Sequence, residues 1–315
     1  MRAYRCHRKG RAATMGVEEV PPPEAGPGEV LVRVAMASLN PVDWKIAAGE
    51  YSLLLKGGFP RTLGVDFAGE IAAVGPGVAD RAGGEAVMGF VDPFMRIHGT
   101  FAELVPVPAA FVVARPATID ARLGAALPCA GSTAVSLCNI AQVGAGSRVL
   151  VNGASGGVGH LAMQVAKARG ARVTAVASAA RMALAQSLGA DDFIDYRSVG
   201  VDRWPGGFDA VLDCVPNLAR GVHGRLLRRG GHYASTLPGA ATYTVDPLLN
   251  RLGHLSRHAV SLAPDAAVFD ELFRHVDAGR LRCEIAGEFT LASAADAMAE
   301  SRRGHVAGKL LVRIA

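Results

Sequence analysis

The sequence lacks a long apolar run, a cysteine framework and a marked excess of one charge. No uninterrupted apolar stretch of about 18 residues occurs, so no segment has the composition of a membrane-spanning helix. The five cysteines are odd in number and include no C-x-x-C pair, which excludes a disulfide framework and a four-cysteine zinc lobe. The 33 basic side chains exceed the 28 acidic ones by only five and are dispersed, so we expect no nucleic-acid partner.

The N-terminal residues are basic, but no apolar stretch follows them as it would in a secretory signal. We therefore expect a cytoplasmic protein with reduced thiols and without a membrane partner. A length of 315 residues suggests about two domains, each large enough to form a core without a covalent staple.

The chain shows two different sequence patterns. The first hundred residues carry short β-like runs between glycines and prolines, as does the segment after 283, whereas the middle alternates apolar strands with alanine-rich helical patterns. The alternation predicts strands at 148–152, 172–177, 192–196, 210–214, 232–235 and 258–262, and helices at 158–169, 179–188, 218–227 and 265–278. We expect an α/β protein with a doubly wound parallel-sheet domain at 118–264, inserted into a β-rich domain at 1–117 and 265–315.

A glycine-rich turn at 152–159 follows the first of these strands and precedes a helix. It matches the dinucleotide-binding fingerprint with Ala154 at the tight turn, Gly156 where a pyrophosphate approaches, and Gly159 where helix and strand pack. The alternative is a turn with a purely structural role. The residues expected to hold the cofactor phosphates at the start of the helix are Ser155, Gly156, Gly157 and Val158.

The residues after the next two strands favour NADPH over NADH. An NAD site would place Asp or Glu at the end of the second strand, but the chain has Ala177 and Ser178 there. Arg181 falls in the first turn of the next helix, where a cation is unfavourable unless it meets an anion such as a 2′-phosphate. Tyr196 ends the third strand and is placed to bind the adenosine part. The alternative for Arg181 is a solvated surface side chain.

We expect the stretch 235–239 after the fifth strand, through Ser235 and Leu237, to line the cofactor site.

Three further segments complete the pattern: Asn-Pro-Val-Asp-Trp-Lys at 40–45, Gly-Val-Asp-Phe-Ala-Gly at 64–69 and Ala-Gly-Ser-Thr-Ala at 130–134. Together with the glycine turn, they make the whole chain resemble the medium-chain dehydrogenase/reductase superfamily, and within it the zinc-free quinone oxidoreductase and enone reductase branch. The resemblance implies a GroES-like catalytic domain, a Rossmann domain, a cleft between them and a homodimer formed along the edge of the Rossmann sheet.

The resemblance also bears on zinc. Zinc-dependent relatives take their ligands from the positions of Asn40, Val65 and Cys129, of which only Cys129 keeps a ligating side chain. A catalytic zinc needs three protein ligands, so we expect no metal. Cys129 is either a small buried apolar residue or, if it lines the cleft, an alkylation target for electrophilic substrates.

Without a metal, the reaction needs groups that position the substrate and stabilise an enolate-like charge. The candidates are Asn40 and Lys45, facing the carbonyl or the nicotinamide ribose, while Thr133 is expected against the nicotinamide ring. The alternative for Lys45 is a solvated side chain, and Asp43 has an alternative role as a turn acceptor. The proton comes from Tyr51 or from solvent.

The predicted function is an NADPH-dependent reductase that transfers hydride to α,β-unsaturated carbonyls or quinones. The alternatives are a dedicated enoyl reductase of a biosynthetic pathway and an NADPH-binding protein without turnover.

Overall fold

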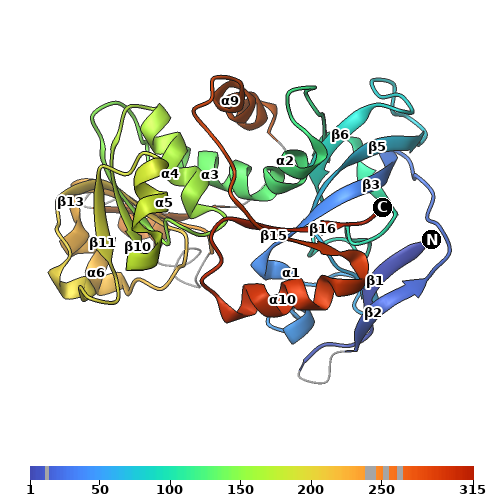
Figure 1. The fold of residues 1–315 in the computed structure, drawn as a ribbon, viewed down its shortest axis with the longest axis horizontal. Coiled ribbons are helices and arrows are strands. Elements are labelled where there is room, and N and C mark those ends of the chain that lie inside the picture. Colours follow the sequence, from blue (N-terminus) through green and yellow to red (C-terminus); the bar gives the residue numbers. More distant parts are fainter. Residues whose placement is uncertain (11–13, 238–245, 251–254, 261–264) are drawn as a thin grey trace. The chain divides into compact units, whose positions relative to one another are not determined.

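The computed structural model describes residues 1–10, 14–237, 246–250, 255–260 and 265–315 of the chain (Figure 1). The chain forms two compact units, of which unit 1 comprises Met1–Cys129 with Ile285–Ala315 and unit 2 comprises Ala130–Glu284. Among the helices described, none has the length and apolar character needed to cross a membrane.

The two boundaries fall later in the chain than the expected ones at 117/118 and 264/265. Helix α2 (Ala121–Ala126) belongs to unit 1 because it packs on β3 (Glu29–Leu39) and β5 (Asp66–Val74). Helix α9 (Ala266–Asp277) belongs to unit 2 because its Glu271 pairs with Arg169 at 2.9 Å. Contacts between distant segments therefore decide both boundaries, and the change in sequence pattern along the chain does not reveal these contacts.

Unit 1 contains a seven-stranded sheet in the order β15-β16-β3-β5-β6-β8, with β7 also paired to β3, and a three-stranded sheet in the order β2-β1-β4. The remaining strands are β1 (Arg2–Cys6), β2 (Met15–Glu19), β4 (Arg61–Thr62), β6 (Ala86–Phe90), β7 (Leu104–Pro108), β8 (Val112–Ala114), β15 (Ile285–Thr290) and β16 (Lys309–Arg313). Strand β16 runs antiparallel to β3 with Leu310 opposite Leu39. The C-terminal strand thus lies beside the end of β3.

Helix α1 (Pro41–Ala48) follows β3 directly and lies beside α10 (Ala294–Arg303), as Figure 1 shows. Proline at the first position and an Asp43 carboxylate that accepts the Asn40 N–H at 2.8 Å start this helix, and Gly49 with φ 87° ends it. No helix is predicted here from apolar periodicity, because eight residues are too few to display it. Trp44 holds α1 to α10 by donating to Ser301 Oγ at 3.2 Å.

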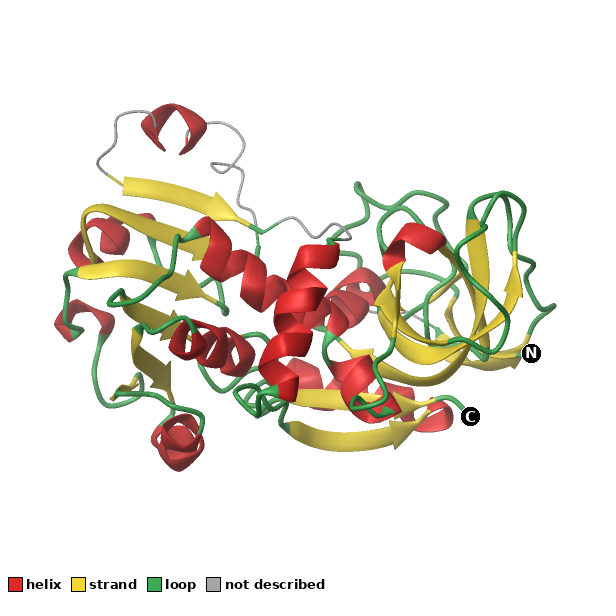
Figure 2. Ribbon diagram, turned by 90° about the horizontal axis from the view of Figure 1, so that it is seen from above, coloured by secondary structure: helices red, strands yellow, loops and turns green. Residues whose placement is uncertain are grey.

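In the part of the chain that the structure describes, unit 2 is built on a six-stranded parallel sheet in the order β11-β10-β9-β12-β13-β14 (Figure 2). Its strands are β9 (Arg148–Asn152), β10 (Arg172–Ala177), β11 (Asp192–Asp195), β12 (Phe208–Asp213), β13 (Leu227–Ser235) and β14 (Leu255–Ala259). Its helices besides α9 are α3 (Pro128–Ile140, which begins in unit 1), α4 (Gly159–Ala168), α5 (Met182–Ser187), α6 (Arg220–Leu226) and α8 (Asp246–Asn250), with short 3₁₀ turns η2 (Ala179–Arg181) and η3 (Val201–Arg203). The expected doubly wound sheet is confirmed.

The strand order reverses between β9 and β12, so these two neighbours flank the switch point where ligands bind in open parallel sheets. The glycine turn follows β9 and therefore lies at this point.

Candidate functional site

The glycine turn is shaped so that larger residues do not fit at two positions. A Cβ on Gly159 would lie 2.1 Å from the carbonyl oxygen of Gly153, and a Cβ on Gly153, whose φ is 76°, would lie 2.2 Å from Val215 Cγ2. At Gly156, by contrast, the nearest atom would be 3.4 Å away. Contacts within the protein thus require glycine at 153 and 159, whereas a Cβ at Gly156 would be tolerated, so these contacts do not explain the glycine there.

The residues expected to hold phosphates, Ser155, Gly156, Gly157 and Val158, are half-buried at the start of α4. The first N–H groups of a helix lack partners within the helix and carry a partial positive charge. A helix start that follows a parallel strand through a glycine turn fits the pyrophosphate of a dinucleotide, so the residues present fit the expected cofactor.

A buried polar network that sequence patterns do not reveal supports this turn from β12. The Asp213 carboxylate, which is fully buried, accepts from Asn152 Nδ2 at 2.8 Å and from the Tyr233 hydroxyl at 2.6 Å. Burial and the Asp213 charge raise the pKa of Tyr233 well above its usual value, so its hydroxyl remains a donor. Because Asn152 is the last residue of β9, Asp213 fixes the point from which the glycine turn departs.

Helix α4 also holds the last residues of unit 2. His160 Nδ1 bonds the carbonyl of Gly156 at 2.8 Å, and its Nε2 accepts the backbone N–H of Glu284 at 3.2 Å. One turn later, the Gln164 amide bonds both the N–H and the carbonyl of Arg282, each at 2.9 Å. The imidazole is therefore neutral, and it connects the glycine turn to the segment that leaves unit 2.

The residues expected at the adenosine ribose follow β10 and β11. Ser178 precedes η2, and its hydroxyl makes no capping hydrogen bond there, while Arg181 is the last residue of η2 and half-buried. Tyr196 is 42% exposed, and the Arg197 guanidinium lies 5.9 Å from its ring centroid. Since β10 and β11 are neighbours, the structure places these residues at the same edge of the sheet. The sequence pattern did not single out Arg197, whose guanidinium lies beside Tyr196 at this edge.

Ser235 ends β13, and its hydroxyl bonds both the N–H and the carbonyl of Leu237, at 3.3 and 3.2 Å. Leu237 itself is 39% exposed, and residues 238–239 of the predicted stretch lie outside the described residues. Thr133 is a buried residue of α3. All the predicted cofactor residues lie in unit 2, whereas Asn40, Lys45 and Tyr51 all lie in unit 1.

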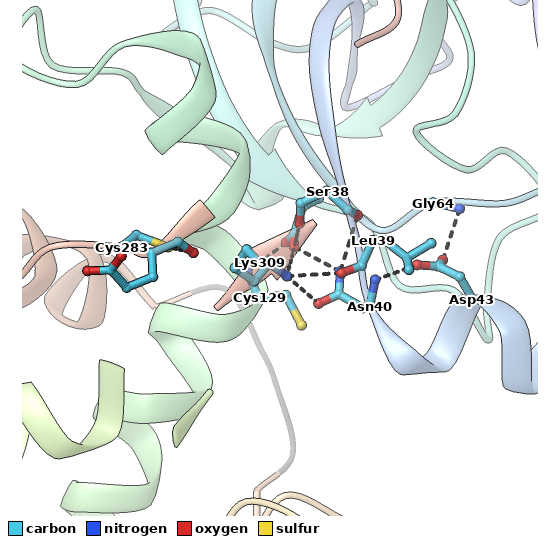
Figure 3. Close-up of polar contacts among 10 residues, drawn as sticks. Ser38, Leu39, Asn40, Asp43, Gly64, Cys129, Cys283 and Lys309 are labelled. Carbon is cyan, nitrogen blue, oxygen red and sulfur yellow. Dashed lines mark hydrogen bonds and ion pairs between the residues drawn. The ribbon is translucent and has the colours of Figure 1, made fainter. Parts of the chain in front are cut away.

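In unit 1, Asn40 belongs to a buried cluster around Asp66, and Figure 3 labels Ser38, Asn40, Cys129 and Lys309 of this cluster. The Oδ2 atom of Asp66 accepts from Ser38 Oγ at 2.6 Å and from Asn40 Nδ2 at 2.8 Å, and its Oδ1 accepts the backbone N–H of Cys129 at 2.7 Å. Lys309 completes the cluster, with its ammonium 2.7 Å from Asn40 Oδ1 and 3.4 Å from Asp66 Oδ2. The Asn40 carboxamide is thus bonded within the protein on both its oxygen and its nitrogen.

Asp43 is fully enclosed at the start of α1. Its carboxylate accepts the backbone N–H groups of Asn40 at 2.8 Å and Gly64 at 3.0 Å. Burial raises the pKa of this carboxyl to about 7, although both N–H groups act in the opposite direction. Its hydrogen bonds match the turn-acceptor role.

Lys45 and Tyr51 are half-buried. The Lys45 ammonium lies 4.0 Å from Glu50 Oε2 and 5.6 Å from the centroid of the Trp44 ring. The Tyr51 ring meets Phe94 edge-on at 5.4 Å, and burial raises the pKa of its hydroxyl, so the hydroxyl keeps its proton and is a weaker acid than a solvated tyrosine. The roles of Lys45 at the substrate carbonyl and of Tyr51 as proton donor stay predictions.

The positions of the zinc ligands do not fit a zinc ion. The Asn40 oxygen faces the Lys309 ammonium, Val65 is buried and has no donor atom, and only the half-buried Cys129 offers a ligand. A second cation beside the buried ammonium would also be repelled. Over the part of the chain that the structure describes, no cluster of three or more His, Cys, Asp or Glu could hold a metal.

Two family models match the chain: the alcohol dehydrogenase GroES-like domain over residues 26–117 and the zinc-binding dehydrogenase over residues 188–312. The chain is 34% identical to the chloroplast envelope quinone oxidoreductase homolog of Arabidopsis thaliana over 96% of this chain and 95% of that protein. It is 31% identical to the chloroplastic NADPH-dependent alkenal/one oxidoreductase of the same plant, over 92% and 73%.

Among solved structures, the quinone oxidoreductase from Coxiella burnetii superposes with a TM-score of 0.89 at 30% identity, covering 100% of this chain and 99% of that one. The expected cytoplasmic location is wrong by these comparisons, because the names of the two plant relatives place them in the chloroplast. The absence of a recognisable secretory signal therefore does not determine the cellular location. The matches support an NAD(P)H oxidoreductase, and the chain belongs to the medium-chain dehydrogenase/reductase superfamily, in its quinone oxidoreductase branch.

Proposed function

We propose that this protein reduces α,β-unsaturated carbonyls or quinones with NADPH and without zinc. The observation that carries the proposal is the glycine turn at the switch point, where close contacts require Gly153 and Gly159 but do not account for the glycine at 156. The names of relatives that reduce quinones and alkenals support the acceptor class.

The residues of unit 2 would hold the cofactor. Backbone N–H groups of Ser155, Gly157 and Val158 bind the pyrophosphate beside Gly156, whose own N–H donates to the Gly153 carbonyl at 3.0 Å. Arg181 with Ser178 binds the 2′-phosphate. Tyr196 lies against the adenine, and Ser235, Leu237 and Thr133 line the nicotinamide side. Bound NADPH supplies the hydride.

The residues of unit 1 would serve the acceptor. Lys45 donates to the carbonyl oxygen as negative charge develops there, and Tyr51 or solvent delivers the proton that completes the two-electron reduction. The half-buried ammonium of Lys45, held near Glu50 and Trp44, suits this role because an incompletely solvated cation stabilises charge more strongly than a free one.

An acceptor panel tests the reaction: NADPH oxidation is followed with small enones, ortho- and para-quinones and acyl thioesters. We expect turnover with enones or quinones. Turnover restricted to acyl thioesters would make the protein a dedicated enoyl reductase, and tight NADPH binding without turnover on any acceptor would make it a binding protein.

The cofactor preference is tested separately by the dissociation constants for NADPH and NADH. A charge-assisted bond to the 2′-phosphate is worth about 1.5–3 kcal/mol, so Arg181→Ala should weaken NADPH binding by about 10-fold to 100-fold and leave NADH binding unchanged. Arg302→Ala, an exposed arginine of α10, is the matched control. Equal dissociation constants of the unaltered protein for the two cofactors would remove the NADPH assignment.

A further inference from the structure

Lys309 is a buried lysine to which sequence analysis assigns no role. It opens β16 and is 3% exposed, and its ammonium has three acceptors: Asn40 Oδ1 at 2.7 Å, the Leu39 carbonyl at 3.3 Å and Asp66 Oδ2 at 3.4 Å (Figure 3). An ammonium has three N–H donors, so this pocket uses all of them.

Stability alone does not explain this ion pair. Removing two charges from water costs several kcal/mol per ion, and a well-packed apolar pair of similar volume is often as stable or more stable. Leu311, which lies two residues along β16 and therefore on the same face as Lys309, is a buried apolar residue, so an apolar pair at positions 309 and 66 would suit this face. The cation therefore has a role other than packing.

The contacts of the ammonium show what it controls. Because Lys309 faces Asn40 Oδ1 and Asp66 faces Asn40 Nδ2, the carboxamide has one orientation: a flipped amide would point its NH₂ group at the ammonium. The same carboxylate binds the N–H of Cys129 near the start of α3. A single charge pair thus holds the end of β3, the start of α1 and the start of α3 together.

Asn40 and Cys129 stand at two of the positions that supply zinc ligands in metal-dependent relatives, and both contact the Lys309–Asp66 pair. We propose that Lys309 is a positioning residue whose ammonium supplies, as part of the chain, the cation that organises this site in place of a metal ion. It acts through Asn40 and the start of α1, the helix that carries Lys45. This inference rests on the proposed reductase function.

The test compares Lys309→Met, Asp66→Asn and the double variant, with Lys56→Met, an exposed lysine of the same unit, as control. Unfolding by urea, the dissociation constant for NADPH, and kcat and KM for the best acceptor of the panel are measured for each. Lys309→Met leaves Asp66 unpaired and should lose stability. The double variant has no unpaired charge, so it should regain part of that stability; the rest stays lost because an amide keeps only one of the two oxygens that accept from Ser38, Asn40 and Cys129.

The decisive comparison is between the double variant and Asp66→Asn, which differ only at Lys309. We expect kcat of the double variant to be about 10²-fold lower than kcat of Asp66→Asn, because small displacements of catalytic groups have effects of this size. The dissociation constant for NADPH should be the same in both variants. Equal kcat values would overturn the proposal. If Asp66→Asn does not fold, the double variant is compared with the unaltered protein, and recovery of full kcat together with stability would assign Lys309 a merely structural role.

Zinc uptake is an independent readout that needs no turnover. Unaltered protein and the double variant are incubated with Zn²⁺, dialysed and assayed for bound metal. We expect the unaltered protein to retain none after dialysis; one bound zinc per chain would overturn the proposal. If the unaltered protein reduces no acceptor, the proposed function fails, while the stability and zinc results still decide whether Lys309 supplies the cation.

Discussion

Asn40 and Asp43 lie three residues apart at the start of α1, yet their side chains do different work in the folded unit. Asn40 bonds Asp66 and Lys309, whereas Asp43 closes the first turn of the helix and accepts the N–H of Gly64. The local motif identifies this segment as important. It does not identify Lys309, which is 269 positions away from Asn40 in the chain and is brought to it by sheet pairing.

The raised pKa of Asp43 makes stability depend on pH. Its folded pKa is about 7, against an ordinary value of 3.8, so the folded form retains a proton that the unfolded chain releases between about pH 4 and pH 7. This contribution is fully present below pH 4 and is lost as the pH rises through 7. The difference between these two pKa values corresponds to a contribution of about 4 kcal/mol to the free energy of unfolding.

Urea unfolding at pH 5 and pH 8 measures this effect. Between pH 5 and pH 8, the free energy of unfolding of the unaltered protein should fall by more than that of Asp43→Asn. The amide of the variant has no proton to lose, so the stability of the variant changes less between the two pH values. Asp80→Asn, at an exposed position of the same unit, should keep the unaltered pH dependence. An unchanged pH dependence in Asp43→Asn would contradict the raised pKa.

At the scale of elements, the glycine turn and α4 form the part of the site that local sequence describes best. Strand β9, the turn and α4 are consecutive, and the predicted strand at 148–152 and helix at 158–169 agree with β9 and α4 to within a residue. The supports of this turn, Asp213 on β12 and the contacts of His160 and Gln164 with residues 282–284, come from segments distant in the chain.

Gly159→Ala tests the packing of this element. The added Cβ would lie 2.1 Å from the Gly153 oxygen and 3.0 Å from Ala154 Cα, and both are backbone atoms that cannot yield without moving the turn. We expect a loss of stability of about 1–3 kcal/mol and weaker NADPH binding, measured by urea unfolding and by titration.

Gly221→Ala is the matched control, because a Cβ at this position of α6 meets no atom within 4 Å. Alanine favours a helix over glycine by up to about 1 kcal/mol, so this variant should be unchanged or more stable. Tolerance of Gly159→Ala in both measurements would show that the turn is less constrained than the contacts indicate.

At the scale of the whole molecule, the chain builds most of unit 1, forms unit 2 and returns to complete the sheet of unit 1 with β15 and β16. The homodimer remains a proposal at this scale. Among the described strands, β14 stands last in the order of the unit 2 sheet, and an edge strand is a template for pairing with another copy.

Light scattering on the purified protein tests the dimer. We expect a particle of twice the chain mass that persists on dilution to the concentrations used in activity assays. A particle of the chain mass at all concentrations would refute pairing between copies.

The sequence by itself determined the family, the glycine turn and the strand–helix alternation of unit 2, because each depends on residues close together in the chain. It also located Asn40, Lys45 and Arg181 as candidates. Only the tertiary structure decided where the two units divide, that Asn40 is held by Asp66 and Lys309, and that Asp213 supports the start of the turn. These features depend on which distant strands become neighbours in the fold. They also depend on burial, which strengthens the contacts of an ammonium or carboxylate with groups that lie far away along the chain.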